Sequence, residues 1–141
     1  MEREVALRTV GGGIAGTVVL SFLLLFLEVQ TRSRVRVADV VIEYVGTPGQ
    51  QSIALVLFVL VTAVLWPLAF VALENRDLLP GRTRMRRAVI FATALAVAFA
   101  VTGRGELQGP VLILYGAAVL GAHVAYGLTL ARVLRPIGQP D

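Results

Sequence analysis

The stretch SIALVLFVLVTAVLWPLAFVAL, residues 52–73, decides the fold of this chain. Its twenty-two residues include no charged side chain, and fourteen of them are Leu, Ile, Val or Phe. As an α-helix that rises about 1.5 Å per residue, the stretch spans the roughly 30 Å hydrocarbon core of a bilayer. Each of the fourteen side chains contributes about −0.4 kcal/mol to membrane insertion, which makes about −6 kcal/mol in all. The sequence therefore predicts a membrane-spanning helix here.

Three further apolar runs have the length of a membrane span. They cover residues 9–27, 88–103 and 110–131, and none contains Asp, Glu or Arg. The run 88–103 is the weakest, because six of its residues are alanine and its insertion energy reaches only about −3 kcal/mol. We expect its neighbours to stabilise it. The predicted fold class is all-α: an integral membrane four-helix bundle that forms a single domain over residues 1–141.

Composition supports the membrane class and excludes several kinds of site. The chain is 57% hydrophobic and only 16% charged, which is too apolar for a water-soluble domain of this size. It has no cysteine, so disulfides, thiolate metal sites and iron–sulfur clusters are excluded within the chain. The net charge of +4 comes from arginines at the span ends. This placement indicates contact with lipid headgroups, and we expect no nucleic-acid partner.

The distribution of arginines predicts the orientation in the membrane. Nine of the thirteen lie in the N-terminal tail, the second loop and the C-terminal tail, and four lie in the first and third loops. The positive-inside rule then places both termini in the cytoplasm and makes this a multi-pass protein of the cell membrane. The first apolar run is longer than the apolar part of a signal peptide, so we expect it to stay in the mature protein.

The first external loop carries a helical pattern of its own. Gly46 and Pro48 end the pattern, and Asp39 and Glu43 lie on its polar side. The sequence predicts a short interfacial amphipathic helix, with the two acids on a solvated face. The alternatives are a strand over residues 34–37 and a cation or partner site at the two acids. Apolar residues at helical spacing make the other face: Val37, Val40, Val41, Tyr44 and Val45.

Small residues mark faces on which helices can pack. Such residues let two backbones approach closely, which drives helix association in lipid. In the third span an alanine stripe from residue 92 to residue 100 predicts a central position for that span. In the first and last spans the candidate packing positions are Gly12, Gly13, Gly16, Thr17, Ser21, Gly116 and Gly127.

Pro67 interrupts the second span. It has no N–H to donate to the carbonyl of Ala63, and this predicts a bend in the helix. Such bends usually shape a bundle, and in some transporters they line a substrate site.

His123 is the only histidine of the chain and lies within the last span, close to Tyr126. A buried imidazole needs a partner, so we expect it to face the bundle interior. The leading interpretation is a hydrogen bond to a neighbouring helix, and the alternatives are a proton relay and a cofactor ligand. No second histidine or cysteine is present to complete a metal site, so no metal and no cofactor are predicted.

The order of these features resembles a family of small, uncharacterised four-span prokaryotic membrane proteins of haloarchaeal type. The resemblance rests on GGGIAGTVVLS at residues 11–21, on Gly46 and Pro48, and on the last-span motif His-x-x-Tyr-Gly at residues 123–127. Similar proteins often carry a further polar or histidine residue where this chain has Gln51 and Ser52, so the resemblance does not imply a two-histidine site here. Some similar proteins resemble neighbours of respiratory oxidase components.

The sequence contains no recognisable catalytic motif. It has no paired carboxylates within a span, no HExxH and no GxSxG, and we expect a protein that is not an enzyme. The favoured function is an accessory or scaffolding subunit of a membrane complex, with a respiratory complex among the candidates. Its partners would be the lipid bilayer and other membrane subunits or further copies of itself. The alternative is a small carrier or proton-coupled transport subunit that uses His123, Tyr126 and the Pro67 bend.

Overall fold

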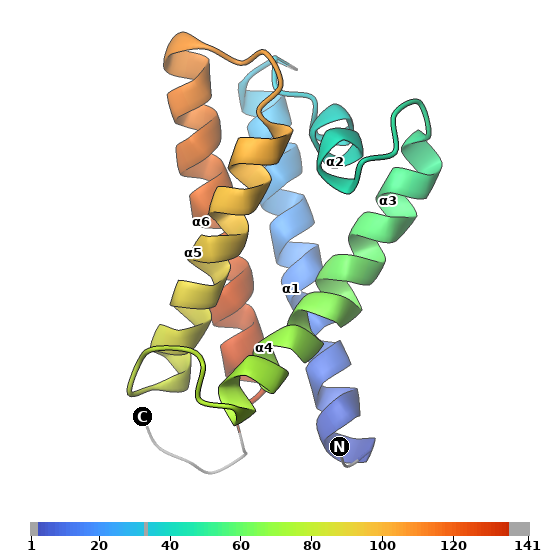
Figure 1. Ribbon diagram of the computed structural model, residues 1–141. Coiled ribbons are helices and arrows are strands. Elements are labelled where there is room, and N and C mark those ends of the chain that lie inside the picture. The colour runs from blue at the N-terminus through green and yellow to red at the C-terminus, as the bar shows by residue number, and fades with distance from the viewer. Residues whose placement is uncertain (1–2, 33, 136–141) are drawn as a thin grey trace.

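The computed structural model describes residues 3–32 and 34–135, and the regular elements in these ranges are all helical (Figure 1). Four segments are long and apolar enough to cross a membrane, and one of them is the continuous helix Gln51–Asn75. The expected all-α four-helix bundle is therefore confirmed. The elements in order are α1 (Arg3–Gln30), α2 (Val37–Val45), α3 (Gln51–Leu60), the π-helical turn η1 (Val61–Leu65), α4 (Trp66–Asn75), α5 (Arg84–Gly103) and α6 (Gly109–Val133).

The long apolar helices extend beyond the apolar runs that predict them. The first helix covers residues 3–30 where the apolar run covers 9–27. α5 begins four residues before its run, directly after Thr83, whose Oγ1 accepts a hydrogen bond of 3.2 Å from the Arg86 N–H. This side chain satisfies one of the free donors at the start of the helix. Helical hydrogen bonding thus continues into the charged flanks, where the side chains are no longer apolar.

α6 lies between α1 and α5. It packs against α1 on one side and against α5 on the other, whereas α5 makes most of its contacts with α6 alone. The expectation that the third span is central is wrong, and α5 is the least buried of the four crossing helices. Its alanine stripe is nevertheless a packing face, because Ala92 lies against Gly127 of α6.

α1 begins and α6 ends at the same end of the bundle. We call it the terminal end, and α2 lies at the opposite end, the α2 end (Figure 1). At the terminal end Arg84 of α5 connects its helix to α4 and to the end of α6. Its Nε lies 2.9 Å from the Glu74 carboxylate on α4, and its Nη1 donates to the carbonyl of Leu134 at 2.7 Å.

The helix predicted in the first loop is present as α2. Gly46 ends it in the left-handed conformation, with φ of 75°. Residues 34–36 before it form a bend and an extended residue, so the alternative of a strand over residues 34–37 is wrong. The helix begins at Val37, whose N–H donates to the Glu28 carboxylate on α1 at 3.0 Å.

The apolar face of α2 is turned into the bundle. Val40 and Val41 are buried, and the helix packs against both α3 and α5. α3 leans away from α1 and α5, and α2 fills the wedge that this tilt opens (Figure 1). The amphipathic pattern is therefore explained by contact with the protein's own helices.

Candidate functional site

The second span changes its helical register just before Pro67. The Trp66 N–H donates to the carbonyl of Val61, five residues back, as in a π-helix. The next residue, Pro67, has no N–H to offer. The Thr62 carbonyl therefore receives neither of the backbone donors that would normally reach it. The bend expected at Pro67 takes the form of this π-helical turn followed by α4.

Tyr126 of α6 satisfies the freed carbonyl. Its hydroxyl donates to the Thr62 carbonyl at 2.6 Å, and both residues are fully buried. The phenol ring reaches this place because α1 has no side chain at Gly16, where a Cβ would lie 2.7 Å from the Tyr126 ring. This single bond joins the last span to the irregular turn of the second span.

Two threonine hydroxyls extend the contact to α1. Thr17 Oγ1 lies 2.9 Å from Thr62 Oγ1 and 2.8 Å from the carbonyl of Gly13. Thr62 Oγ1 donates in turn to the carbonyl of Phe58 at 2.9 Å. Thr17, Thr62 and Tyr126 form what we call the central polar cluster. It ties α1, η1 and α6 together inside an otherwise apolar interior.

Gly13 lets α1 approach the irregular turn. A Cβ at this position would overlap the carbonyl of Ala63 and the ring of Pro67. The Ala63 carbonyl of the irregular turn therefore lies directly against α1 at Gly13. Only glycine leaves room for this approach.

The remaining packing candidates divide into two groups. Gly12 lies against Leu130 and Val133 of α6, and Gly127 lies against the Ala88 carbonyl of α5. By contrast, a Cβ on Gly116 would meet nothing within 4 Å, and Ser21 is half-buried. The glycines at close contacts therefore serve contacts within this chain.

His123 is fully buried, but its hydrogen bond is not the one expected. Nδ1 lies 2.8 Å from the carbonyl of Val119, one turn back on the same helix. A carbonyl can only accept, so Nδ1 carries the proton and Nε2 of the neutral ring holds a lone pair. Nε2 is buried and has no hydrogen-bond partner in the part of the chain that the structure describes. The expected bond to a neighbouring helix is replaced by one within α6.

Aromatic rings surround the imidazole. The centroid of its ring lies 5.6 Å from that of Trp66 on α4 and 5.2 Å from that of Phe99 on α5. Tyr44 of α2 packs on both of these rings, at 6.4 Å and 5.0 Å. Burial among these apolar groups raises the pKa of the Tyr44 phenol, because the charged form would lose its water. We call Tyr44, Trp66 and Phe99 the aromatic shell.

The aromatic shell was not predicted from the sequence. Its members come from three different elements, and hydropathy gives no information on which side chains share a depth in the bundle. The one available signal was Trp66, the only tryptophan of the chain, directly before the proline of a membrane span. Together with the predicted His123 and Tyr126, it lies at the point where α4 and α6 meet, and its ring centroid is 5.6 Å from that of Tyr126.

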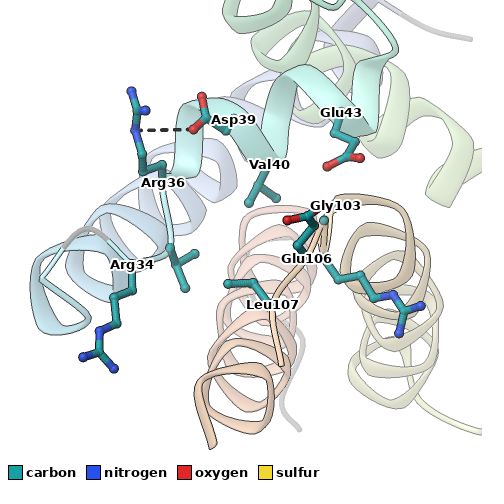
Figure 2. A pocket seen from close by; sticks show the side chains of 11 residues that line it. Arg34, Arg36, Asp39, Val40, Glu43, Gly103, Glu106 and Leu107 are labelled. Carbon is teal, nitrogen blue, oxygen red and sulfur yellow. Dashed lines mark ion pairs between the residues drawn. The ribbon is translucent and has the colours of Figure 1, made fainter. Parts of the chain in front are cut away.

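A charged pocket of about 170 Å³ opens at the α2 end (Figure 2). The α1–α2 connection, α2 and the α5–α6 loop line it. The carboxylates of Glu43 and Glu106 turn toward the space beside Gly103, whereas Arg34 points outward. Arg36 and Asp39 form an exposed ion pair of 3.3 Å, which contributes little to stability. Asp39 and Glu43 are both exposed, and no three His, Cys, Asp or Glu side chains converge on a metal position within residues 3–32 and 34–135.

An apolar groove of about 410 Å³ runs between α1 and α6, on the half of the bundle toward the α2 end. We call it the α1–α6 groove. Its floor includes Gly121, where a Cβ would meet nothing within 4 Å. The residues that line it are Leu23, Phe26, Leu27, Gln30, Leu114, Ala118, Gly121 and Ala122.

A family of unknown function (DUF6789) matches residues 3–140, nearly the whole chain. No curated protein and no solved structure matches the chain. The expectation of an uncharacterised family is confirmed at this level.

Proposed function

The chain belongs to this family of unknown function, and we propose that it acts as a non-catalytic accessory or scaffolding subunit of a membrane complex. The observation that carries the proposal is the open α1–α6 groove on a bundle whose central polar cluster is already engaged in contacts between its own helices. A respiratory complex is one candidate for the assembly.

The interior of the bundle is used to hold its own helices together. The hydroxyls of Thr17, Thr62 and Tyr126 all lie in contacts within the chain. The glycines at close helix contacts are covered by the chain's own α4, α5 and α6. These small-residue faces are therefore not the surface that meets a partner.

The α1–α6 groove supports the partner surface instead. In lipid the hydrophobic effect does not drive helices together, and their association depends on close packing. A groove in which the backbone is accessible therefore favours the binding of another helix. On the α6 side of the groove the small residues Ala118 and Gly121 leave the backbone accessible. On the α1 side Phe26 lines the groove, with about half of its surface exposed. The expected occupant is a transmembrane helix of another subunit or of a second copy, lying along α6.

The proposed location is the cell membrane, with the terminal end of the bundle in the cytoplasm. The number of candidate spans is even, and α1 begins at the end of the bundle where α6 finishes. Both observations support the placement of the two termini on the same side of the membrane. The excess of arginine in the tails and in the loop between α4 and α5 supports the cytoplasmic side.

The test is purification from the native membrane in mild detergent, with the mass of the complex and its other subunits recorded. Gly121→Leu places a bulky side chain in the groove. Gly116→Leu is the matched control, because a side chain there also meets nothing within 4 Å on the same helix. We expect Gly121→Leu to lose the partner and Gly116→Leu to keep it, with both variants folded. A wild-type chain that purifies alone as a monomer would contradict the proposal.

A second candidate function is a small carrier or proton-coupled transport subunit. The unpartnered Nε2 of His123, next to the irregular turn of the second span, favours it, because an ionisable group at this depth is a candidate for transport chemistry. The experiment is transport by the isolated protein in liposomes. This function requires that His123→Ala abolish transport while the protein remains folded.

A further inference from the structure

The imidazole of His123 lies against Trp66 and Phe99, the two rings on which Tyr44 of α2 packs. Nδ1 is occupied by the Val119 carbonyl, so Nε2 is the only free acceptor of the ring. Buried polar atoms nearly always have a partner, and one without a partner calls for an explanation. We propose that Nε2 of His123 is an intramembrane proton-binding site and that α2 is the plug that closes it from the α2 end. This inference goes beyond the accessory role, and it does not depend on transport because equilibrium protonation needs no net flux.

The packing around the ring favours a proton over a larger ligand. The Trp66 and Phe99 centroids lie only 5.6 Å and 5.2 Å from that of the imidazole, which leaves the rings in direct contact. A metal ion or a small solute would need space and further ligands. A proton needs neither, because it adds to the existing lone pair.

Burial among these rings removes water from the imidazole and so opposes its charged form, whereas the attraction of the two rings for a cation acts in the opposite direction. A cation within about 6 Å of the centroid of an aromatic ring is attracted by the ring's negative face. Trp66 and Phe99 both lie within this distance of the imidazole, on two different helices. Protonation would therefore give an imidazolium flanked by two aromatic partners.

No carboxylate of the described residues lies at the depth of the imidazole. The titratable groups near it on the surrounding elements are the phenols of Tyr44 on α2 and of Tyr115 and Tyr126 on α6. Glu43, the acid of α2 nearest to its C-terminal end, faces the charged pocket instead (Figure 2). The aromatic rings are thus the main partners for a positive charge. The charged residues of the neighbouring helices lie at the helix ends: Arg3, Glu4, Arg8, Glu28, Glu74, Arg84, Arg86, Arg87 and Arg132.

α2 closes the aromatic shell from above. Tyr44 covers Trp66 and Phe99, the two rings that touch the imidazole. The helix is held at one end by the bond from Val37 to Glu28, and in its middle by Val40 against Gly103. It occupies the wedge between α3 and α5, so outward movement of α2 as a unit would uncover the shell and the ring behind it (Figure 1).

The first experiment uses Trp66, the only tryptophan of the chain, as a reporter of His123. A protonated imidazole quenches the emission of a neighbouring indole. We expect acidification of the protein in lipid nanodiscs to lower Trp66 emission reversibly in the wild type and not in His123→Gln. Phe99→Leu, which keeps the histidine and removes one aromatic partner, should shift the transition to lower pH. Circular dichroism and size-exclusion chromatography check that each variant is folded.

Two outcomes of this experiment would overturn the proton site. One is emission that stays constant with pH until the wild type unfolds. The other is the same loss of emission in His123→Gln as in the wild type. Neither outcome bears on partner capture by the α1–α6 groove, so failure of this inference is distinguishable from failure of the accessory role.

The second experiment tests α2 as the plug. Gly103→Val would push against Val40, because a Cβ at Gly103 has no room beside that side chain. Gly116→Val is the matched control in open space. We expect the quenching constant of Trp66 by aqueous iodide to rise in Gly103→Val and to stay unchanged in Gly116→Val. Equal quenching in both variants, with both folded, would exclude the plug.

Discussion

The Tyr126 hydroxyl lies 2.6 Å from the carbonyl oxygen of Thr62, sixty-four residues earlier in the chain. The bond exists because the π-helical register and Pro67 together leave this carbonyl without a backbone donor. A carbonyl left bare in the interior of a membrane protein would be costly. The irregular turn of the second span thus supplies the acceptor, and Tyr126 of the last span supplies the donor, of one hydrogen bond.

Tyr126→Phe should therefore destabilise the bundle by about 1–2 kcal/mol, because it leaves the Thr62 carbonyl without its donor. The measurement is the free energy of unfolding in mixed detergent micelles. Tyr44→Phe is the control, since it removes a phenol hydroxyl for which no hydrogen bond is present among the described residues. Equal losses in the two variants would show that the Tyr126 bond has no special weight.

Gly13→Ala should be far more harmful than Gly11→Ala. The methyl group of the first would overlap the Ala63 carbonyl and Pro67, whereas the second meets nothing within 4 Å. Overpacking of this kind costs about 1–3 kcal/mol, while alanine is the better helix former at an open position. Thermal stability in detergent gives the comparison. If Gly13→Ala were as stable as Gly11→Ala, the close approach of α1 to η1 would be refuted.

Glu28→Ala should loosen α2. Its carboxylate accepts from the Val37 N–H at the start of that helix, and loss of such a cap costs about 1 kcal/mol. We expect faster amide exchange at residues 37–40, measured by mass spectrometry in nanodiscs. Glu43→Ala, an exposed acid on α2 itself, serves as the control and should leave the exchange unchanged. Protection that persists in Glu28→Ala would mean that the apolar face alone holds α2.

The orientation in the membrane can be tested with single cysteines, because the chain has none of its own. Gln108→Cys lies in the loop between α5 and α6, and Asp77→Cys lies between α4 and α5. With both termini in the cytoplasm, a membrane-impermeant thiol reagent should label Gln108→Cys on intact cells. It should label Asp77→Cys only after permeabilisation. Labelling of both from the same face would contradict the four-span topology.

Much of the fold was accessible from the sequence. The apolar runs identified the four long apolar helices, the spacing of valines identified α2, and Pro67 marked the irregular turn. The candidate site was predicted only in part. His123 and Tyr126 were recognised, but the partner of His123 was sought on another helix and is the Val119 carbonyl of its own. The tilt of α3, which admits α2, had no signal in the hydropathy pattern.

The sequence by itself identified the segments that are long and apolar enough to cross a bilayer, because this property depends on side-chain composition and length alone. It did not determine which helices pack against one another. Inside the bilayer the lipid is as apolar as the protein interior, so lipid-facing and buried residues look alike in sequence. The place of α6 between α1 and α5 and the meeting of Tyr126 with Thr62 were decided by the tertiary structure, through the fit of glycine against ring and backbone and through the Thr62 carbonyl that needed a donor.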